Sequence, residues 1–305
     1  MSEASKPTVS VVIPTYNRAS LLGRSIRSVL EQTYDDLELI VVDDASSDNT
    51  SEVVLHFSDS RIRYVRRDRN GNCPAARNAG IIASTGRFVA FNDDDDEWLP
   101  DKLERQMRVF EVAPAQVGVV YCDFWAIRNG EKSLYRATHI MPEDGMAFRR
   151  ALAFPESGIW LQTAIFRREC FDEVGMLDET LPIFSDAEIF FRVCKHYCLH
   201  HVSIPLMNLW VTPGSMMSNH DAIAKDLKTI LTRYQEDIKV DSRLETKYFM
   251  KLSWEMHSVG QQMTACKYLA RGLATSPSEF LAYLLKYLRH VGGSWDTRWS
   301  VSESS

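Results

Sequence analysis

Apolar and polar residues alternate with two different periods over about the first hundred residues of the chain. Apolar runs rich in β-branched residues occur four times, which predicts four strands: Val9–Ile13, Leu37–Val42, Arg61–Val65 and Phe88–Phe91. Between them the apolar residues recur at helical spacing. One such helix carries Leu22 and Ile26, a second begins near Asp48 or Asn49, and a third begins near Pro74. This alternation predicts a mostly parallel sheet with helices on both faces.

Polar clusters follow three of these four strands. They cover Thr15–Arg18, Asp43–Asp48 and Asn92–Glu97. In an open sheet of parallel strands, ligands bind outside the carboxyl ends of the strands. We therefore expect these three loops to form one binding site.

The alternation of predicted strands and helices ends after a helix that we expect between about Pro100 and Glu111. Asn129-Gly130 is a strong signal for a two-residue hairpin turn. The further elements expected in this part are strands at Val117–Ile127 and Leu134–Ala137, an apolar segment at Ile159–Phe166, a short helix ending near Gly175, a helix from Asp186 and a strand at Ile204–Trp210. From about Asp221 the chain has a helical pattern, with breaks near Val240, Gly260 and Ser276-Pro277.

Composition and charge narrow the class of protein. Hydrophobic residues make up 45% of the 305-residue chain and charged residues 25%, which is typical of a globular protein. The formal charge of −6 argues against a nucleic-acid partner held by general basicity. The apolar runs are shorter than the roughly 20 residues that cross a bilayer, the N-terminus does not resemble a signal peptide, and six cysteines do not form a disulfide scaffold. We expect a cytoplasmic protein.

Four consecutive aspartates, Asp93–Asp96, and Glu97 come directly after the fourth predicted strand. Two unit charges about 4 Å apart repel by about 4 kcal/mol at the effective dielectric of a protein surface. One interpretation is a solvated loop leading into an acidic helix N-terminus, with Asp96 and Glu97 as helix-entry residues. The other is a site for Mg²⁺ or Mn²⁺, which prefer carboxylate oxygens and leave coordination positions for phosphate and water.

The other two loops contain side chains suited to a nucleotide. Pro14 ends the first strand, and Thr15, Tyr16 and Asn17 occupy the turn after it, where an aromatic ring can lie against a base. Asp44 follows the second strand, where a carboxylate can accept from a base NH or a ribose hydroxyl. The sequence has no G-x-G-x-x-G fingerprint and no Walker A motif, so side chains would hold such a ligand.

Five segments, taken together, resemble the motif series of the family 2 glycosyltransferases. They are VSVVIPTYNRASLL, SVLEQTYDDLELIVVDDASSDNT, CPAARNAGI, GRFVAFNDDDDEWLPDKL and SDAEIFFRV, in family order over about residues 8–215. The resemblance implies an inverting enzyme with the GT-A fold, a Rossmann-like, mostly parallel α/β sheet flanked by helices. It implies a nucleotide-sugar donor, most simply a UDP-sugar, and a carbohydrate or lipid-linked acceptor.

The resemblance also implies roles for individual residues. The donor-binding positions that it implies are Pro14, Thr15, Tyr16, Asn17, Asp44, Arg77, Asp93 and Asp94. The family's Asp-x-Asp pair falls on Asp93 and Asp95, so Asp95 is the expected ligand of Mn²⁺ or Mg²⁺, with Asp93 as a second candidate. Asp93 or Asp94 would then reach the ribose or the sugar. Arg77 alternatively forms a structural ion pair with the acidic loop.

The same resemblance places the general base at Asp186, in FSDAEIFFR, with Ser185 where the family usually has glutamate. One carboxylate that removes the acceptor proton suffices for an inverting reaction. Asp186 could instead only cap the helix that follows it. Thr212 stands where the family often has a histidine near the diphosphate, which puts that contact in doubt.

We expect two domains, a GT-A domain at 1–218 and a helical extension at 219–305. Within the first, residues 1–115 would bind the donor and 116–218 the acceptor. The extension would serve as a homodimer contact or position the acceptor. Its segment 280–290 would pack against the other helices of the extension or make a peripheral contact with the inner face of a membrane. The predicted function is sugar transfer in polysaccharide, glycolipid or cell-surface glycan synthesis. The alternatives are a catalytically silent nucleotide- or carbohydrate-binding homologue and a sugar-nucleotide nucleotidylyltransferase.

Overall fold

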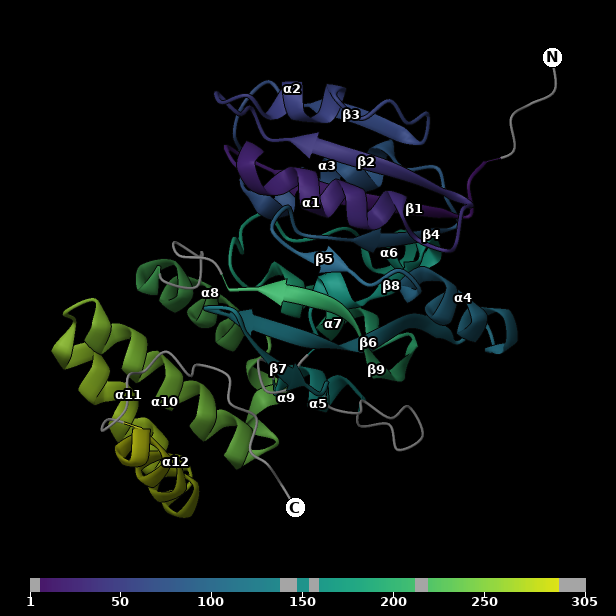
Figure 1. Cartoon of the computed structure of the whole chain (residues 1–305). Coiled ribbons are helices and arrows are strands. Elements are labelled where there is room, and N and C mark those ends of the chain that lie inside the picture. Colours follow the sequence, from purple (N-terminus) through teal and green to yellow (C-terminus); the bar gives the residue numbers. More distant parts are fainter. Residues whose placement is uncertain (1–5, 138–146, 154–158, 212–218, 291–305) are drawn as a thin grey trace. The chain divides into compact units, whose positions relative to one another are not determined.

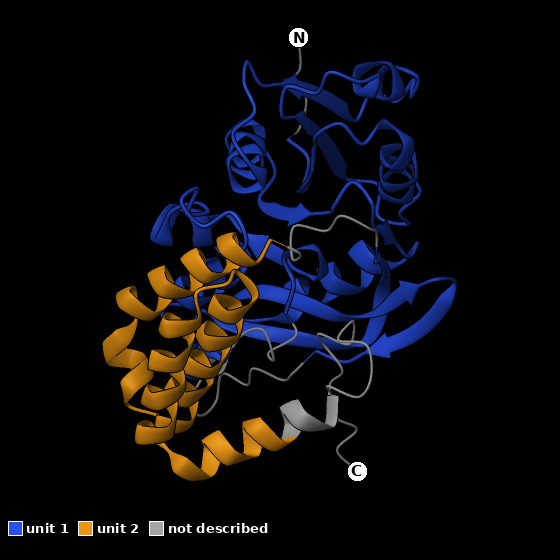
Figure 2. Cartoon of the chain, turned by 90° about the vertical axis from the view of Figure 1, so that its left-hand side faces the viewer, with its two compact units in different colours: residues 1–213 blue, residues 214–305 orange. Residues whose placement is uncertain are grey.

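The structure is a computed structural model that describes residues 6–137, 147–153, 159–211 and 219–290. The chain divides into two compact units, residues 1–213 and residues 214–305 (Figure 2). Thr212 lies outside the described residues.

The first four long strands form the parallel half of the sheet in unit 1, in the order β3-β2-β1-β4 (Figure 1). The strands are β1 (Val9–Thr15), β2 (Leu37–Asp43), β3 (Ile62–Arg66) and β4 (Phe88–Phe91), and the helices are α1 (Ala19–Leu30), α2 (Thr50–Leu55) and α3 (Cys73–Ala83). β2 lies beside β1, and β3 lies beside β2 on the same side. The chain then crosses to the opposite side of β1, where it forms β4. Right-handed crossovers therefore place α1 and α2 on one face and α3 on the other. These elements confirm the strands and helices predicted for this region.

The sheet continues from β4 with strands of mixed direction, in the order β8-β6-β9-β5. The strands here are β5 (Glu97–Trp98), β6 (Val117–Arg128), β7 (Glu131–Tyr135), β8 (Ile165–Arg167) and β9 (Cys198–Trp210), and the helices are α4 (Lys102–Val112), α5 (Ala147–Leu152), α6 (Arg168–Val174) and α7 (Ser185–Val193). β7 forms the predicted hairpin with β6. Asn129 and Gly130 have φ of 51° and 84°, the left-handed conformations that a type I′ turn requires.

The structure refines one sequence prediction and contradicts another. The apolar segment Ile159–Phe166 contains a 3₁₀ turn at Leu161–Thr163, and β8 begins only at Ile165. Asp96 and Glu97 are not helix-entry residues, because Glu97–Trp98 pairs with β9 as a short strand and α4 begins at Lys102. Both segments are short, so sequence periodicity could not separate strand from turn or helix entry.

The core of unit 1 is aliphatic around the parallel strands and aromatic farther along the sheet. All seven residues of β1 and of β2 are buried, as expected for central strands covered on both faces. Phe166 of β8 packs its ring against Phe91, Phe171 and Phe190, with ring centroids 5.2–6.2 Å apart. These contacts join β4, β8, α6 and α7, and so fix where the loops after β4 and before α7 lie. Trp98 is also buried.

Unit 2 consists of helices α8 (His220–Arg233), α9 (Gln235–Lys239), α10 (Ser242–Ser258), α11 (Gln262–Thr275) and α12 (Pro277–His290). Ala224, Met256 and Ala265 form a small core from three of them. The predicted breaks near Val240, Gly260 and Ser276 are present, and a further break at Tyr234, which the sequence does not predict, separates α8 from α9. In the described part of the chain, no helix combines the length and the apolar character needed to cross a membrane.

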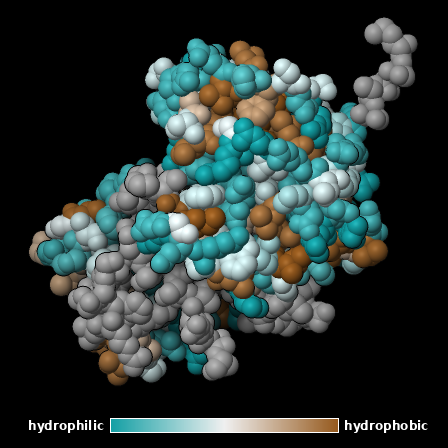
Figure 3. Space-filling view, viewed as in Figure 1, coloured by the Kyte–Doolittle hydropathy of each residue, from teal (hydrophilic) through white to brown (hydrophobic). Residues whose placement is uncertain are grey.

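Hydrophilic side chains cover most of the face that is shown in Figure 3, and apolar side chains occur there in small separate groups. Single exposed apolar residues are ordinary on a protein surface. The polar clusters that the sequence predicts to bind a ligand follow β1, β2 and β4, at the carboxyl ends of the parallel strands.

Candidate active site

Three loops gather at the carboxyl edge of the parallel strands, as the sequence predicts. The β1–α1 and β2–α2 loops are joined by Asn17, whose backbone φ is 51°. The side-chain oxygen of Asn17 accepts from the backbone N–H of Ser47 at 2.7 Å. The backbone N–H of Asn17 donates to the Ser46 hydroxyl at 2.9 Å. The Asn17 side chain thus orders the loops, and Tyr16 beside it is half exposed.

The carboxylate of Asp44 lies at the end of β2 and is buried. It accepts from the Arg67 guanidinium and from the backbone N–H groups of Gly71 and Asn72, at 3.0 and 3.1 Å. Its neighbour Asp43 faces a different set of donors, the backbone N–H of Ser46, the hydroxyl of Tyr64 and the guanidinium of Arg66. A base NH that bonds Asp44 would share its oxygens with these groups.

Arg77 links the acidic loop to α7 through the middle of the site. Its Nη2 donates to Asp93 Oδ1 at 2.7 Å, and its Nη1 donates to Asp186 Oδ1 at 2.5 Å. Only 5% of Arg77 is exposed. Burial alone would lower the pKa of Arg77, but Asp186 and Asp93 raise this pKa well above its usual value. Arg77 is a permanent cation between two carboxylates that lie 93 positions apart in the sequence.

Asp186 lies in the first turn of α7 and its side chain points to Arg77. The N-cap residue of α7 is Phe184, so Asp186 does not cap this helix. Burial raises the pKa of Asp186, the charge of Asp93 raises it further, and the Arg77 ion pair opposes both effects. The result is a carboxylate whose proton affinity is higher than that of an ordinary aspartate, as a general base requires.

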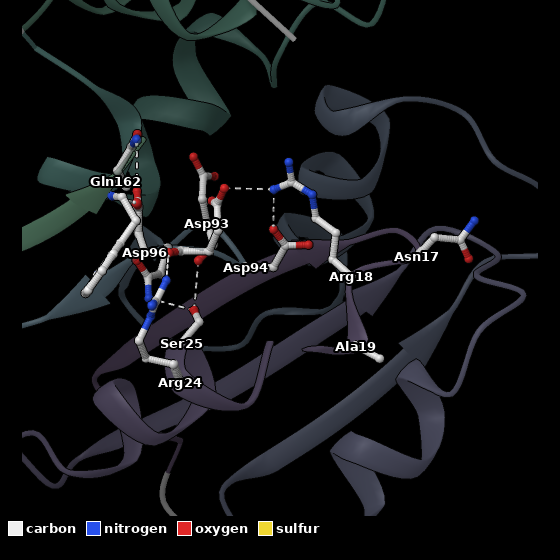
Figure 4. Close-up of polar contacts among 12 residues, drawn as sticks. Asn17, Arg18, Ala19, Arg24, Ser25, Asp93, Asp94, Asp96 and Gln162 are labelled. Carbon is white, nitrogen blue, oxygen red and sulfur yellow. Dashed lines mark hydrogen bonds and ion pairs between the residues drawn. The ribbon is translucent and has the colours of Figure 1, made fainter. Parts of the chain in front are cut away.

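Arg18 covers the next two aspartates of the run (Figure 4). Its Nη1 donates to Asp94 Oδ1 at 2.9 Å and to Asp95 Oδ2 at 3.0 Å. Burial raises the pKa of Asp94 to about 6, although Arg18 lowers it. Arg24 of α1 donates to the backbone carbonyl of Asp95 and lies 4.2 Å from the ring centroid of Trp210.

Asp96 lies deeper, and it joins the acidic loop to other strands. Its Oδ1 accepts from the backbone N–H of Trp210 at 3.0 Å and its Oδ2 accepts from Gln162 Nε2 at 3.3 Å. Burial raises the pKa of Asp96 well above its usual value, and the charges of Asp93 and Asp95 add to this. The four aspartates therefore have different environments, and Asp96 faces away from the groups that bind Asp93–Asp95.

The chemistry of this loop fits a hard divalent cation with few protein ligands. Asp93, Asp94 and Asp95 supply carboxylate oxygens, the preferred donors for Mg²⁺ and Mn²⁺. Within the described ranges, no three His, Cys, Asp or Glu side chains converge into a complete metal site. One or two carboxylates plus phosphate oxygens form the usual environment of such an ion in nucleotide sites.

A family model described as Glycosyl transferase family 2 matches residues 10–175 of this sequence, more than half of the chain. The chain belongs to glycosyl transferase family 2. The match covers the three loops, Arg77 and the acidic run, and it ends before Asp186. It confirms the resemblance that the five sequence motifs indicated.

Curated bacterial proteins are similar in sequence to this family 2 chain. The "Uncharacterized glycosyltransferase RP339" of Rickettsia prowazekii is 33% identical over 205 residues, 65% of this chain and 63% of the relative. The "UDP-Glc:alpha-D-GlcNAc-diphosphoundecaprenol beta-1,3-glucosyltransferase WfgD" of Escherichia coli is 41% identical over 121 residues, 40% of this chain and 47% of WfgD. The chain thus spans less than two thirds of the length of these curated relatives.

Solved structures of similar fold confirm the GT-A type for this family 2 member. S. aureus TarS 1–349 in complex with UDP-GlcNAc has a TM-score of 0.63 at 17% identity, covering 90% of this chain and 83% of TarS 1–349. The mannosyltransferase PcManGT from Pyrobaculum calidifontis, in complex with GDP-Man and Mn²⁺, has a TM-score of 0.59 at 21% identity, covering 95% of this chain and 82% of PcManGT.

Four residues of this site carry no individual role that the sequence predicts: Arg18, Arg24, Gln162 and Trp210. Arg18 could have been found, because it follows the Thr15–Asn17 turn directly and the predicted sheet places that turn beside the acidic run. Gln162 and Trp210 come from segments far away in the sequence and carry no motif. Only the pairing of β5 with β9 and the packing of the 3₁₀ turn bring them to Asp96.

Proposed function

We propose that this chain is a metal-dependent, inverting glycosyltransferase that moves a sugar from a nucleotide diphosphate to an acceptor hydroxyl. The single observation that carries the proposal is the double ion pair of Arg77 with Asp93 and Asp186. It joins the acidic loop, suited to the donor, to a buried carboxylate suited to the acceptor proton. A carboxylate of raised pKa beside a ligand site is typical of catalytic sites.

In this proposal Asp186 is the general base. It takes the proton from the acceptor hydroxyl as that oxygen attacks the anomeric carbon and the bond to the diphosphate breaks on the opposite face. The configuration at the anomeric carbon is thereby inverted. The high proton affinity of Asp186, maintained by burial, suits this role, and Arg77 keeps the carboxylate ionised and oriented before the proton arrives.

The donor is assigned to the three loops. Tyr16 and Asp44 would bind the base, together with Pro14, Thr15 and Asn17, and Asp93 or Asp94 would reach the ribose or the sugar. Asp95 is assigned to Mn²⁺ or Mg²⁺, with Asp93 as a second ligand, and a bound cation would neutralise charge on the leaving diphosphate. Support comes from TarS with UDP-GlcNAc and from PcManGT with GDP-Man and Mn²⁺.

We assign the donor to the UDP-sugars and the acceptor to a carbohydrate or a lipid-linked glycan of the cell surface. The name of WfgD specifies UDP-Glc and a GlcNAc-diphosphoundecaprenol acceptor, which supports this class. The proposed site of action is the cytoplasm or the inner face of the membrane. The second half of unit 1 and the helices of unit 2 are the parts of the chain left to select the acceptor.

A thermal-shift screen of nucleotide sugars, with and without Mn²⁺, tests the proposal. A ligand that binds the folded state raises its stability by RT ln(1 + [L]/Kd), so even weak donors are visible at millimolar concentration. We expect one UDP-sugar to raise the melting temperature more with Mn²⁺ than without it. Asp95→Asn should remove the Mn²⁺-dependent part of the increase in melting temperature. Glu104→Gln, which removes one partner of the Arg108–Glu104 ion pair on α4, should retain it. A chain that no nucleotide sugar stabilises would contradict the proposal.

A further inference from the structure

Arg18 and the proposed metal ion have the same binding partner. Arg18 Nη1 lies 3.0 Å from Asp95 Oδ2, on the carboxylate that the proposed function assigns to the cation, and 2.9 Å from Asp94 Oδ1. A guanidinium and a divalent cation repel each other, so both cannot sit tightly on one carboxylate. We propose that Arg18 is a built-in counter-ion of the acidic loop that competes with the divalent cation for Asp95. The inference rests on the proposed function of Asp95.

Arg18 is able to move, which such a counter-ion must do. Its side chain is 33% exposed, compared with 6% for Arg77. Arg18 is the last residue before α1, and the hydrogen bonds given by its side chain go to two neighbouring residues of one loop. It can release Asp95 and keep Asp94, because the two bonds are separate. Arg77 has no such freedom, since its partners lie on different elements.

Arg24 cannot take the place of Arg18. It contacts the same loop, but it donates to the backbone carbonyl of Asp95 and its guanidinium lies over the ring of Trp210. A cation that binds the Asp95 carboxylate therefore leaves the Arg24 contact intact. Figure 4 shows this division: Arg18 approaches the aspartates from one side of the loop, and Arg24 and Ser25 contact it from α1.

The pairing has a consequence for the acidic run as a whole. Arg18 offsets the repulsion between Asp94 and Asp95 when no divalent ion is bound to them. Arrival of the cation on Asp95 replaces one positive group by another, so the loop is never left with its charges uncompensated. Arg18, once released from Asp95, keeps its bond to Asp94 and has further N–H donors at the edge of the donor loops, where a diphosphate is the natural partner for them. Cation binding would then prepare the site for the donor.

Titration of the protein with Mn²⁺ alone tests the competition, with the electron paramagnetic resonance signal of free Mn²⁺ as the readout. The proteins are the parent, Arg18→Gln, Arg18→Lys, Asp95→Asn and Arg108→Gln, which removes the same charge from an exposed pair on α4. We expect Arg18→Gln to bind Mn²⁺ more tightly by roughly three- to tenfold, from the loss of a nearby positive charge. Arg18→Lys should stay close to the parent, and Arg108→Gln should match it.

The outcomes separate this inference from the function on which it rests. If the parent binds Mn²⁺ and Asp95→Asn does not, but Arg18→Gln binds as the parent does or more weakly, the competition is wrong and the metal site stands. If Asp95→Asn binds Mn²⁺ as the parent does, both the metal assignment and the competition are wrong. Melting temperatures near the parent's, measured without Mn²⁺, establish that each variant is folded.

Discussion

Arg77 Nη1 and Asp186 Oδ1 form a 2.5 Å ion pair in the interior of unit 1, between α3 and α7. The pair connects a helix that follows the third parallel strand with a helix that lies in the second half of the unit. The partner on the other side of Arg77 is Asp93 of the acidic loop. Under the proposed function, this cation sets both the charge and the position of the general base.

The pH dependence of transfer should report on this pair. The ionised form of Asp186 is the active base, so the rate should fall as the pH falls through its pKa. Burial raises this pKa, so the loss should begin at a higher pH than for an ordinary aspartate. In Arg77→Lys the guanidinium fork is lost, and the acid limb of kcat should move to higher pH by about half a unit to one unit.

The control for this profile is Arg63→Lys, which alters an ion pair with Glu38 at the far end of the parallel strands. It should leave the acid limb where the parent has it. An Arg77→Lys enzyme that is slower at every pH but keeps the parent's acid limb would show that Arg77 does not control the proton affinity of Asp186.

Two helix glycines in unit 1 should respond oppositely to alanine. A Cβ on Gly80 of α3 would lie well inside van der Waals contact with the Val12 side chain of β1. Gly80→Ala should therefore lower the stability by about 1–3 kcal/mol through overpacking. A Cβ on Gly23 of α1 has Val53 Cγ1 as its nearest neighbour, at 4.0 Å. Gly23→Ala should raise the stability by about 0.5–1 kcal/mol. The midpoints of urea unfolding measure both changes in stability. Equal changes of the midpoint in the two variants would contradict the packing of α3 on β1.

Lys102 should make the stability depend on pH in the alkaline range. Its side chain is fully buried, its Nζ donates to Gln106 Oε1 at 2.6 Å, and it lies 4.1 Å from the Trp98 ring centroid. Burial lowers the pKa of Lys102 to about 8. The unfolded chain then binds more protons than the folded chain between about pH 8 and pH 10.5, so stability rises with pH in this range, by about 3 kcal/mol at most.

Lys102→Met should remove this rise. Urea unfolding at pH 7 and at pH 10 measures the effect. We expect the parent to gain stability relative to Lys102→Met as the pH increases. Lys239→Met, which removes a half-exposed lysine of α9, should follow the parent at both pH values. If the difference between the parent and Lys102→Met is the same at both pH values, Lys102 titrates normally despite its burial.

The fold of the parallel half of unit 1 was predictable because each of its elements has a local signal. β-branched runs mark β1 to β4, and Pro74 marks the start of α3, where it occupies the first helical turn. The fold of the second half of unit 1 was less predictable from the sequence. β8 has three residues and β5 has two, and such short strands are defined by the partners that they pair with, which lie far away in the sequence.

The candidate site was predictable as far as motifs reach. Asp93, Asp186 and Arg77 were all selected from the sequence, and the structure brings them into direct contact. The sequence left Arg77 open between a donor contact and a structural ion pair, and it could not reveal that one guanidinium binds both carboxylates. It also missed the different role of Asp96, because four identical residues in a row carry no sign of which one turns inward.

Release of UDP from the donor found in the thermal-shift screen tests the central claim most directly, with the parent compared with Asp186→Asn. The amide keeps the size of the side chain but cannot accept the acceptor proton, so we expect the rate to fall by about 10²–10⁴-fold while the donor and Mn²⁺ still stabilise the variant. Asp172→Asn, on an exposed position of α6, should release UDP at the parent's rate. A parent that releases UDP no faster than Asp186→Asn would contradict the assignment of this chain as a glycosyltransferase with Asp186 as its base.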